Sequence, residues 1–124
     1  MELVTFELAK KLKEKGFPQF DSYKSYFIGD DARRYLTSGS VIDRSKRAED
    51  FHLIAAPTIS KVLKWLREEK EIMFEVPITL TDDGIWKFTF RIQTKEFYDR
   101  SNYEWDTYEK SALAGIEYVL NNLI

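Results

Sequence analysis

Apolar and polar residues alternate along residues 74–92, and this alternation is the clearest structural signal in the chain. The turn sequence Thr81-Asp82-Asp83-Gly84 divides the pattern into two halves. Alternation around an Asp/Gly turn is typical of a β-hairpin with one buried face. We therefore predict an antiparallel hairpin whose buried face carries the apolar side chains of Phe74, Val76, Ile78, Leu80, Trp86, Phe88, Phe90 and Ile92.

The pairing register of this hairpin follows from the requirement that apolar residues face apolar residues across the two strands. A two-residue Asp83-Gly84 turn would shift the register by one and place apolar side chains opposite polar ones. We predict instead a loop of three or five residues with Gly84 at positive φ. The predicted pairs are Leu80 with Trp86, Thr79 with Lys87, Ile78 with Phe88, Val76 with Phe90, Glu75 with Arg91 and Phe74 with Ile92.

Pro77 lies within the first strand of the hairpin and has no backbone N–H to donate. A central strand uses its N–H groups on both sides, so proline is confined to sheet edges and bulges. We predict that the first strand is an edge strand or carries a bulge at Pro77, and that the second strand is central.

Three segments show the signals of amphipathic helices. Residues 6–15 follow the cap residue Thr5 and end at Gly16, and residues 59–70 place apolar side chains on one face. Residues 108–122 follow either a capping box that begins at Asp106 or a cap at Thr107. Gly115 inside this last helix lowers its helix propensity, which indicates a close backbone contact there.

Short strands are predicted at residues 23–28, 33–36 and 51–55, and another near residues 97–98 or 103–105, while residues 43–50 are predicted to be an exposed loop. The elements together predict an α+β fold, with an antiparallel sheet built on the hairpin and the helices packed mainly on one face. The length of 124 residues fits a single domain. Residues 1–56 would supply its N-terminal helix and strands, and residues 57–124 its helix-hairpin-strand-helix core.

Composition and charge exclude several classes of protein. The chain has no cysteine, which excludes disulfides, thiolate catalysis and cysteine-ligated metals. Its hydrophobic fraction of 44% is too high for a disordered protein, and its net charge of −2 does not favour nucleic acid or anionic membranes. No apolar run approaches the ~20 residues that span a bilayer, and no secretory signal begins the chain, so we expect a cytoplasmic location.

No group of residues forms a recognisable catalytic site. His52, the only histidine, has no identifiable partner and is interpreted as structural. The pairs Asp30-Asp31 and Asp82-Asp83 stand beside glycines, where aspartate commonly stabilises turns rather than binding metal. We therefore assign no catalytic residue, metal or cofactor, and favour a protein that is not an enzyme.

The candidate binding residues are aromatic and basic. Tyr98, Tyr103 and Trp105 stand in a polar context, and Tyr and Trp are enriched at protein interfaces. The leading hypothesis is an interaction module that binds an unknown protein partner or forms a homo-oligomer. The alternative is a nucleic-acid-associated accessory protein, whose basic patch would combine the lysines between residues 10 and 15 with Arg33, Arg34, Arg44 and Arg47.

The order helix-hairpin-strand-helix is similar to that of double-stranded RNA-binding domains. Those domains place a basic cluster at the start of the last helix to hold phosphates. In this chain the corresponding stretch, residues 107–112, has a single lysine. RNA binding through that site is therefore not favoured.

Three stretches, at residues 5–17, 56–68 and 106–117, resemble small uncharacterised proteins of Bacteroides-type bacteria that often occur in phage-derived regions. The resembling positions are mostly helix starts and helix faces, at both ends and in the middle of the chain. The resemblance implies an intracellular accessory protein. The proteins that it resembles have no established activity, so no functional residue carries over to this chain.

Overall fold

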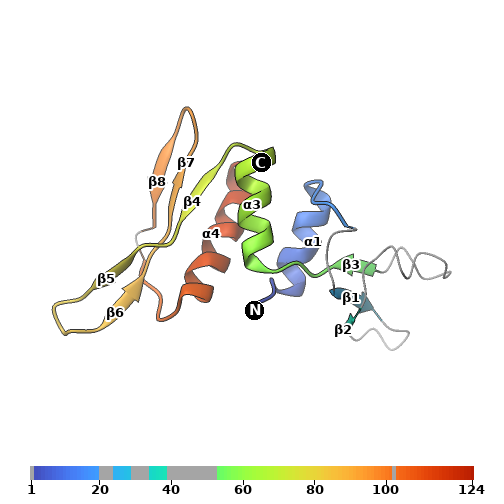
Figure 1. Ribbon diagram of the computed structural model, residues 1–124, viewed down its shortest axis with the longest axis horizontal. Coiled ribbons are helices and arrows are strands. Elements are labelled where there is room, and N and C mark those ends of the chain that lie inside the picture. Colours follow the sequence, from blue (N-terminus) through green and yellow to red (C-terminus); the bar gives the residue numbers. More distant parts are fainter. Residues whose placement is uncertain (1, 20–23, 29–33, 39–52, 102) are drawn as a thin grey trace. The chain divides into compact units, whose positions relative to one another are not determined.

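The structure, a computed structural model, describes residues 2–19, 24–28, 34–38, 53–101 and 103–124 (Figure 1). The predicted loop at residues 43–50 and His52 lie outside the described residues. The fold is α+β, with helices and antiparallel sheets, as the sequence predicted. The chain divides into two compact units, Met1–Thr58 and Ile59–Ile124, and each is described by itself.

The first unit combines one described helix with a three-stranded antiparallel sheet of order β2-β1-β3. The strands predicted in this half of the chain are confirmed with slightly shifted bounds. The Phe6 ring of the helix meets the Tyr26 ring of β1 edge-on, with centroids 5.6 Å apart. The described elements are α1 (Phe6–Glu14), β1 (Lys24–Ile28), β2 (Arg34–Ser38) and β3 (Leu53–Ala55).

Helix α1 begins and ends where its sequence signals predict. The Leu8 backbone N–H donates to Thr5 Oγ1 over 3.3 Å, which satisfies one of the free donors of the first turn. Gly16 ends the helix with φ +92°, a conformation that favours glycine. The Phe17 N–H then donates to the Leu12 carbonyl at 2.9 Å, and both side chains are buried.

The second unit holds the hairpin, a further strand and two helices. Its strands form a three-stranded sheet of order β4-β7-β8 and a two-stranded sheet β5-β6, all antiparallel. Strand β8 confirms one of the two predicted positions for a strand after the hairpin. The elements are α3 (Ile59–Glu69), β4 (Met73–Glu75), β5 (Ile78–Leu80), β6 (Trp86–Phe88), β7 (Arg91–Gln93), β8 (Tyr98–Arg100) and α4 (Tyr108–Asn122).

The predicted register of the hairpin is confirmed. Leu80 lies opposite Trp86, and the next two pairs of β5 and β6 follow in the same register. Phe74 lies opposite Ile92, and its two neighbouring pairs in β4 and β7 keep that register. The Thr81 N–H donates to the Ile85 carbonyl at 2.9 Å, which leaves residues 82–84 as a three-residue loop. Gly84 in that loop has φ +78°, the positive φ that the sequence predicted for it.

Pro77 explains why one hairpin is divided into two short ladders. Two residues on each strand separate the Glu75–Arg91 pair from the Ile78–Phe88 pair, so the strand carries no bulge. The Thr89 N–H donates to the Pro77 carbonyl at 3.1 Å, but the reciprocal bond from Pro77 cannot form. Strand β4 lies at the edge of its sheet and β7 at the centre, as predicted.

Helix α4 covers the apolar face of the hairpin near β4 and β7. The rings of Phe74 and Phe90 lie against the backbone of Gly115, confirming the close contact that this glycine indicated. Of the two predicted caps, Thr107 is the one used, since its Oγ1 accepts from the Lys110 N–H at 3.1 Å. The buried core of this unit includes Val62, Trp65, Leu66, Phe90, Ile92, Ala112, Ile116, Val119 and Leu120.

Candidate functional site

The apolar face of the hairpin continues beyond the helices into solvent. At the β4–β7 end, Phe90 and Ile92 are buried. At the turn end of the same face, Ile78, Leu80 and Trp86 are 56%, 57% and 61% exposed. Figure 1 shows the β5–β6 end extending away from α3 and α4, which explains the difference. We call Ile78, Leu80 and Trp86 the hairpin patch.

The apolar area of this patch comes from three neighbouring residues. Large apolar and aromatic side chains at these exposures present roughly 400 Å² of surface in total. Contiguous apolar patches of that order on soluble proteins commonly mark interaction sites. Ile85, at the turn, is also half exposed, but it lies opposite Thr81 and so belongs to the other face of the hairpin.

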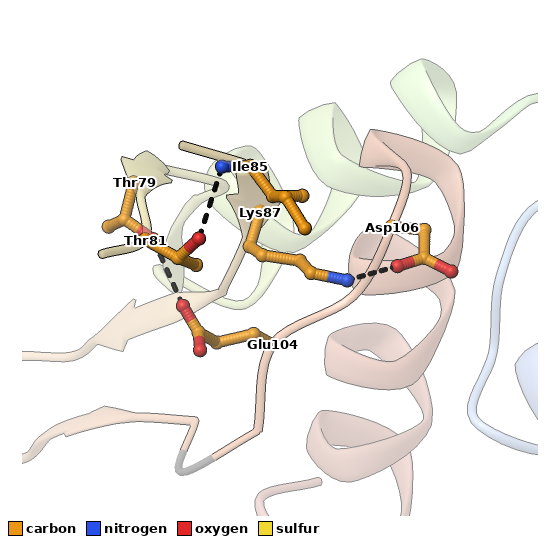
Figure 2. Close-up of polar contacts among 6 residues, drawn as sticks. All are labelled: Thr79, Thr81, Ile85, Lys87, Glu104 and Asp106. Carbon is orange, nitrogen blue, oxygen red and sulfur yellow. Dashed lines mark hydrogen bonds and ion pairs between the residues drawn. The ribbon is translucent and has the colours of Figure 1, made fainter. Parts of the chain in front are cut away.

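The opposite, polar face of the same hairpin is occupied by the chain itself (Figure 2). Lys87 forms an ion pair with Asp106, and Thr79 Oγ1 donates a hydrogen bond to Glu104 Oε2 at 3.1 Å. The hydrogen bond and the positive charge of Lys87 lower the pKa of the Asp106 carboxyl. These contacts fix the segment before α4 beside β6, whereas the apolar side chains at the turn end of the hairpin are exposed in the described part of the chain.

The two edges of the β5–β6 hairpin also differ. At the β6 edge, Phe88 and Trp105 exchange a pair of backbone hydrogen bonds of 2.8 Å, so residue 105 acts as a short third strand. The second predicted position for a strand after the hairpin is thereby also paired. At the β5 edge, no strand pairs with Ile78–Leu80 among the described residues.

The three aromatic residues proposed from the sequence occupy different environments. Trp105 is partly buried, and its ring lies against Phe90 with centroids 5.6 Å apart, so it belongs to the edge of the core. Tyr103 is 76% exposed and its ring centroid lies 6.4 Å from that of Trp105. Tyr98 is exposed on β8. The structure does not bring the three together into one surface.

The lysines of the proposed basic patch lie on or directly after α1 in the described part of the chain, but most of its arginines do not. Arg33, Arg44 and Arg47 lie outside the described residues. Arg34 is placed by its backbone alone, as the partner of Ile28 in the β1–β2 ladder. The basic patch therefore stays a prediction.

The outer face of the β4-β7-β8 sheet carries a shallow hollow lined by Met73, Glu75, Arg91, Gln93 and Tyr98. Arg91 Nη2 donates to Glu75 Oε2 at 2.6 Å, which confirms the predicted cross-strand ion pair. This hydrogen bond, with a smaller contribution from Tyr98, raises the pKa of Arg91. The charges of the hollow are thus paired internally, which makes it a weaker candidate than the hairpin patch.

The hairpin patch was not among the residues proposed from the sequence, because the whole apolar face was expected to be buried. The described residues contain no group of three acidic or histidine side chains placed to hold a metal ion. Within the same residues, no helix has the length and apolar character required to cross a membrane.

Comparison with family models, with curated proteins and with solved structures found no match to this chain. The resemblance to small Bacteroides-type proteins therefore stays a prediction.

Proposed function

We propose that this chain is an interaction module that docks an apolar surface of another protein chain onto the hairpin patch. The observation that carries the proposal is the exposure of Ile78, Leu80 and Trp86 on a face whose other half is the buried core of the unit. Such a face gains free energy when a partner removes it from water. Within this proposal the chain acts inside the cell as an accessory protein, as its resemblance to small, often phage-derived, bacterial proteins implies.

The expected gain in free energy is comparable in size to the cost of association. Burying roughly 400 Å² of apolar surface is worth about 10 kcal/mol at 25 cal/mol per Å². Association itself costs about 4–15 kcal/mol in lost freedom of motion. The patch therefore supports a complex that forms and dissociates, and tight binding would need further contacts.

Site-specific photocrosslinking tests the proposal. A photoreactive phenylalanine analogue replaces Trp86 in the full chain, and the adducts formed in cells are compared with those from the same analogue at Tyr103, an exposed aromatic outside the patch. We expect a discrete protein adduct from position 86 that position 103 does not give. Leu80→Lys in the same chain should abolish that adduct, because the lysine places a charge in the centre of the patch.

A matched control separates loss of the patch from a general effect of the added charge. Met73 is 51% exposed and lies on the opposite face of the sheet, so Met73→Lys adds the same charge to a residue of similar exposure. The adduct should survive this substitution. Equal adducts from positions 86 and 103, or an adduct unaffected by Leu80→Lys, would contradict the proposal.

The nucleic-acid alternative makes a different prediction. It expects a mobility shift with RNA or DNA that weakens steeply as salt is raised and that does not depend on Leu80. A shift of that kind, without a protein adduct at position 86, would favour the alternative over the interaction module.

A further inference from the structure

We infer that the hairpin patch and the neighbouring strand edge receive a second copy of this chain, paired antiparallel along the outer edge of β4 and β5. The inference rests on the proposed function and names its partner. It is carried by the direction of the backbone groups along residues 74–80, by the self-complementarity of that edge and by the area it would cover.

The outward groups of this edge follow from the bonds inside the hairpin. The Thr81 N–H bonds to Ile85 and the Thr89 N–H bonds to Pro77, so odd-numbered residues of the first strand face the second strand. In an antiparallel ladder the facing residues alternate, so the even-numbered residues point their N–H and C=O groups outward. These residues are Phe74, Val76, Ile78 and Leu80, and none of them has a backbone partner on that side among the described residues.

Pro77 does not interrupt this outer row. Its nitrogen faces Thr89 within the hairpin, where it costs one hydrogen bond of the inner ladder. The outer edge therefore presents an unbroken alternation of donors and acceptors. An open edge of this kind, next to exposed apolar side chains, is the feature that recruits a further strand.

The edge is complementary to itself when two copies meet about a two-fold axis at Pro77. Phe74 of one copy then lies opposite Leu80 of the other, and Val76 opposite Ile78, so every outward-pointing residue gains a hydrogen-bonding partner. All four side chains stay on the apolar face, because this register pairs even-numbered residues of one copy with even-numbered residues of the other. Glu75 lies opposite Thr79, so no like charges meet across the new seam.

The same symmetry also covers the part of the hairpin patch that lies next to the β5 edge. The turn end of each hairpin is brought beside the β4 end of the other copy, on the sheet face where α4 covers Phe74 and Phe90. Pairing along this edge covers Ile78 and Leu80 on β5 more than Trp86 on the strand behind it, so the interface is small beside specific interfaces, which bury about 1,200–2,000 Å². We therefore expect a dimer that dissociates on dilution.

Sedimentation velocity of the purified full chain over a wide concentration range tests whether this dimer forms. We expect the wild-type chain to shift from monomer to dimer as concentration rises. Leu80→Lys should weaken the dimer by more than about tenfold, because in a two-fold symmetric dimer one substitution removes the same contact from both copies. Tyr103→Lys, at an exposed aromatic residue outside both the patch and the β4–β5 edge, should leave the dimer unchanged.

Disulfide trapping tests the register independently of stability, since the chain has no cysteine of its own. Residue 77 lies opposite its own copy at a non-hydrogen-bonded pair, where Cα atoms are about 4.5 Å apart and a disulfide is possible. We expect Pro77→Cys to form a disulfide-linked dimer under mild oxidation, and Thr79→Cys, on the same strand face, to form it poorly.

The outcomes separate this inference from the proposed function. A wild-type chain that stays monomeric at every concentration overturns the inference, and so does trapping by Thr79→Cys in preference to Pro77→Cys. A dimer that Tyr103→Lys disrupts and Leu80→Lys does not would place the interface elsewhere on the chain and also overturn it. A strict monomer that still gives the Leu80-dependent adduct at position 86 leaves the proposed function standing with a different protein as partner.

Discussion

At the scale of single residues, the ion pair between Lys87 and Asp106 ties the segment before α4 to the hairpin. Lys87 holds the pKa of the Asp106 carboxyl below its usual value, first through a hydrogen bond and then through its charge. A carboxyl with a lower pKa in the folded state adds stability above the unfolded pKa of about 4. That contribution is lost as the pH falls through the folded pKa.

Replacing Lys87 tests this coupling directly. We expect Lys87→Met to raise the pKa of Asp106 towards its ordinary value, because both the hydrogen bond and the opposite charge are removed. An NMR titration of the Asp106 side-chain carboxyl measures the change. Lys95→Met is the control, since Lys95 pairs with Glu71 and should not affect Asp106. An Asp106 pKa that is the same with and without Lys87 would show that the pair does not persist in solution.

The same carboxylate shows a limit of residue-level prediction. Asp106 and Thr107 had equal claims to cap α4 by sequence spacing. The structure assigns the cap to Thr107 and engages Asp106 with Lys87, which is 19 positions away in the chain. A choice between two local interactions was thus decided by a long-range contact that spacing does not reveal.

At the scale of elements, the contact between α4 and the hairpin depends on the missing side chain of Gly115. A Cβ at this position would clash with the Phe74 ring and would lie 2.9 Å from Phe90 Cγ. Alanine normally favours a helix over glycine by about 1 kcal/mol. Overpacking against two rings costs typically 1–3 kcal/mol or more, so we expect Gly115→Ala to lower the free energy of unfolding, as measured by urea denaturation.

A second substitution tests whether Phe74 is the cause. Phe74→Leu removes the ring atoms that lie closest to the new Cβ. The double variant should therefore be more stable than the sum of the two single effects predicts, by about 0.5–3 kcal/mol in a double-mutant cycle. Additive effects, or a Gly115→Ala chain as stable as the wild type, would contradict this account of the α4–hairpin contact.

The helices and strands were largely predictable from the sequence, but how much of the hairpin the helices cover was not. Alternation and the turn residues were sufficient for the register, because a shift by one residue would expose every apolar side chain. The extent of burial depends on lengths. Helix α3 has 11 residues and is about 16 Å long, whereas eight strand residues from 73 to 80 span about 26 Å. Comparing these lengths would have indicated that Ile78 and Leu80 extend past α3.

At the scale of the whole molecule, the pairing of helices with sheets could not be read from the sequence. The helices show similar amphipathic stripes, so the pattern does not say which sheet each one covers. In the structure α1 lies against the strands of its own unit, through Phe6 and Tyr26 for example, while α4 covers the hairpin. The candidate site depends on this partition, because the hairpin patch is the part of its sheet that α3 and α4 leave uncovered.

The charge of the whole molecule bears on the force that drives self-association. The formal net charge is −2, and Lys87, Arg91 and Lys95 near the hairpin are each paired with an acidic side chain. Association through the hairpin patch should therefore be driven by burial of apolar surface. We expect sodium chloride to leave the dimer unchanged and ammonium sulfate to strengthen it in sedimentation experiments. Dissociation by sodium chloride would instead indicate ion pairs between the copies, because salt screens exposed charges. The apolar mechanism would then be wrong even if a dimer exists.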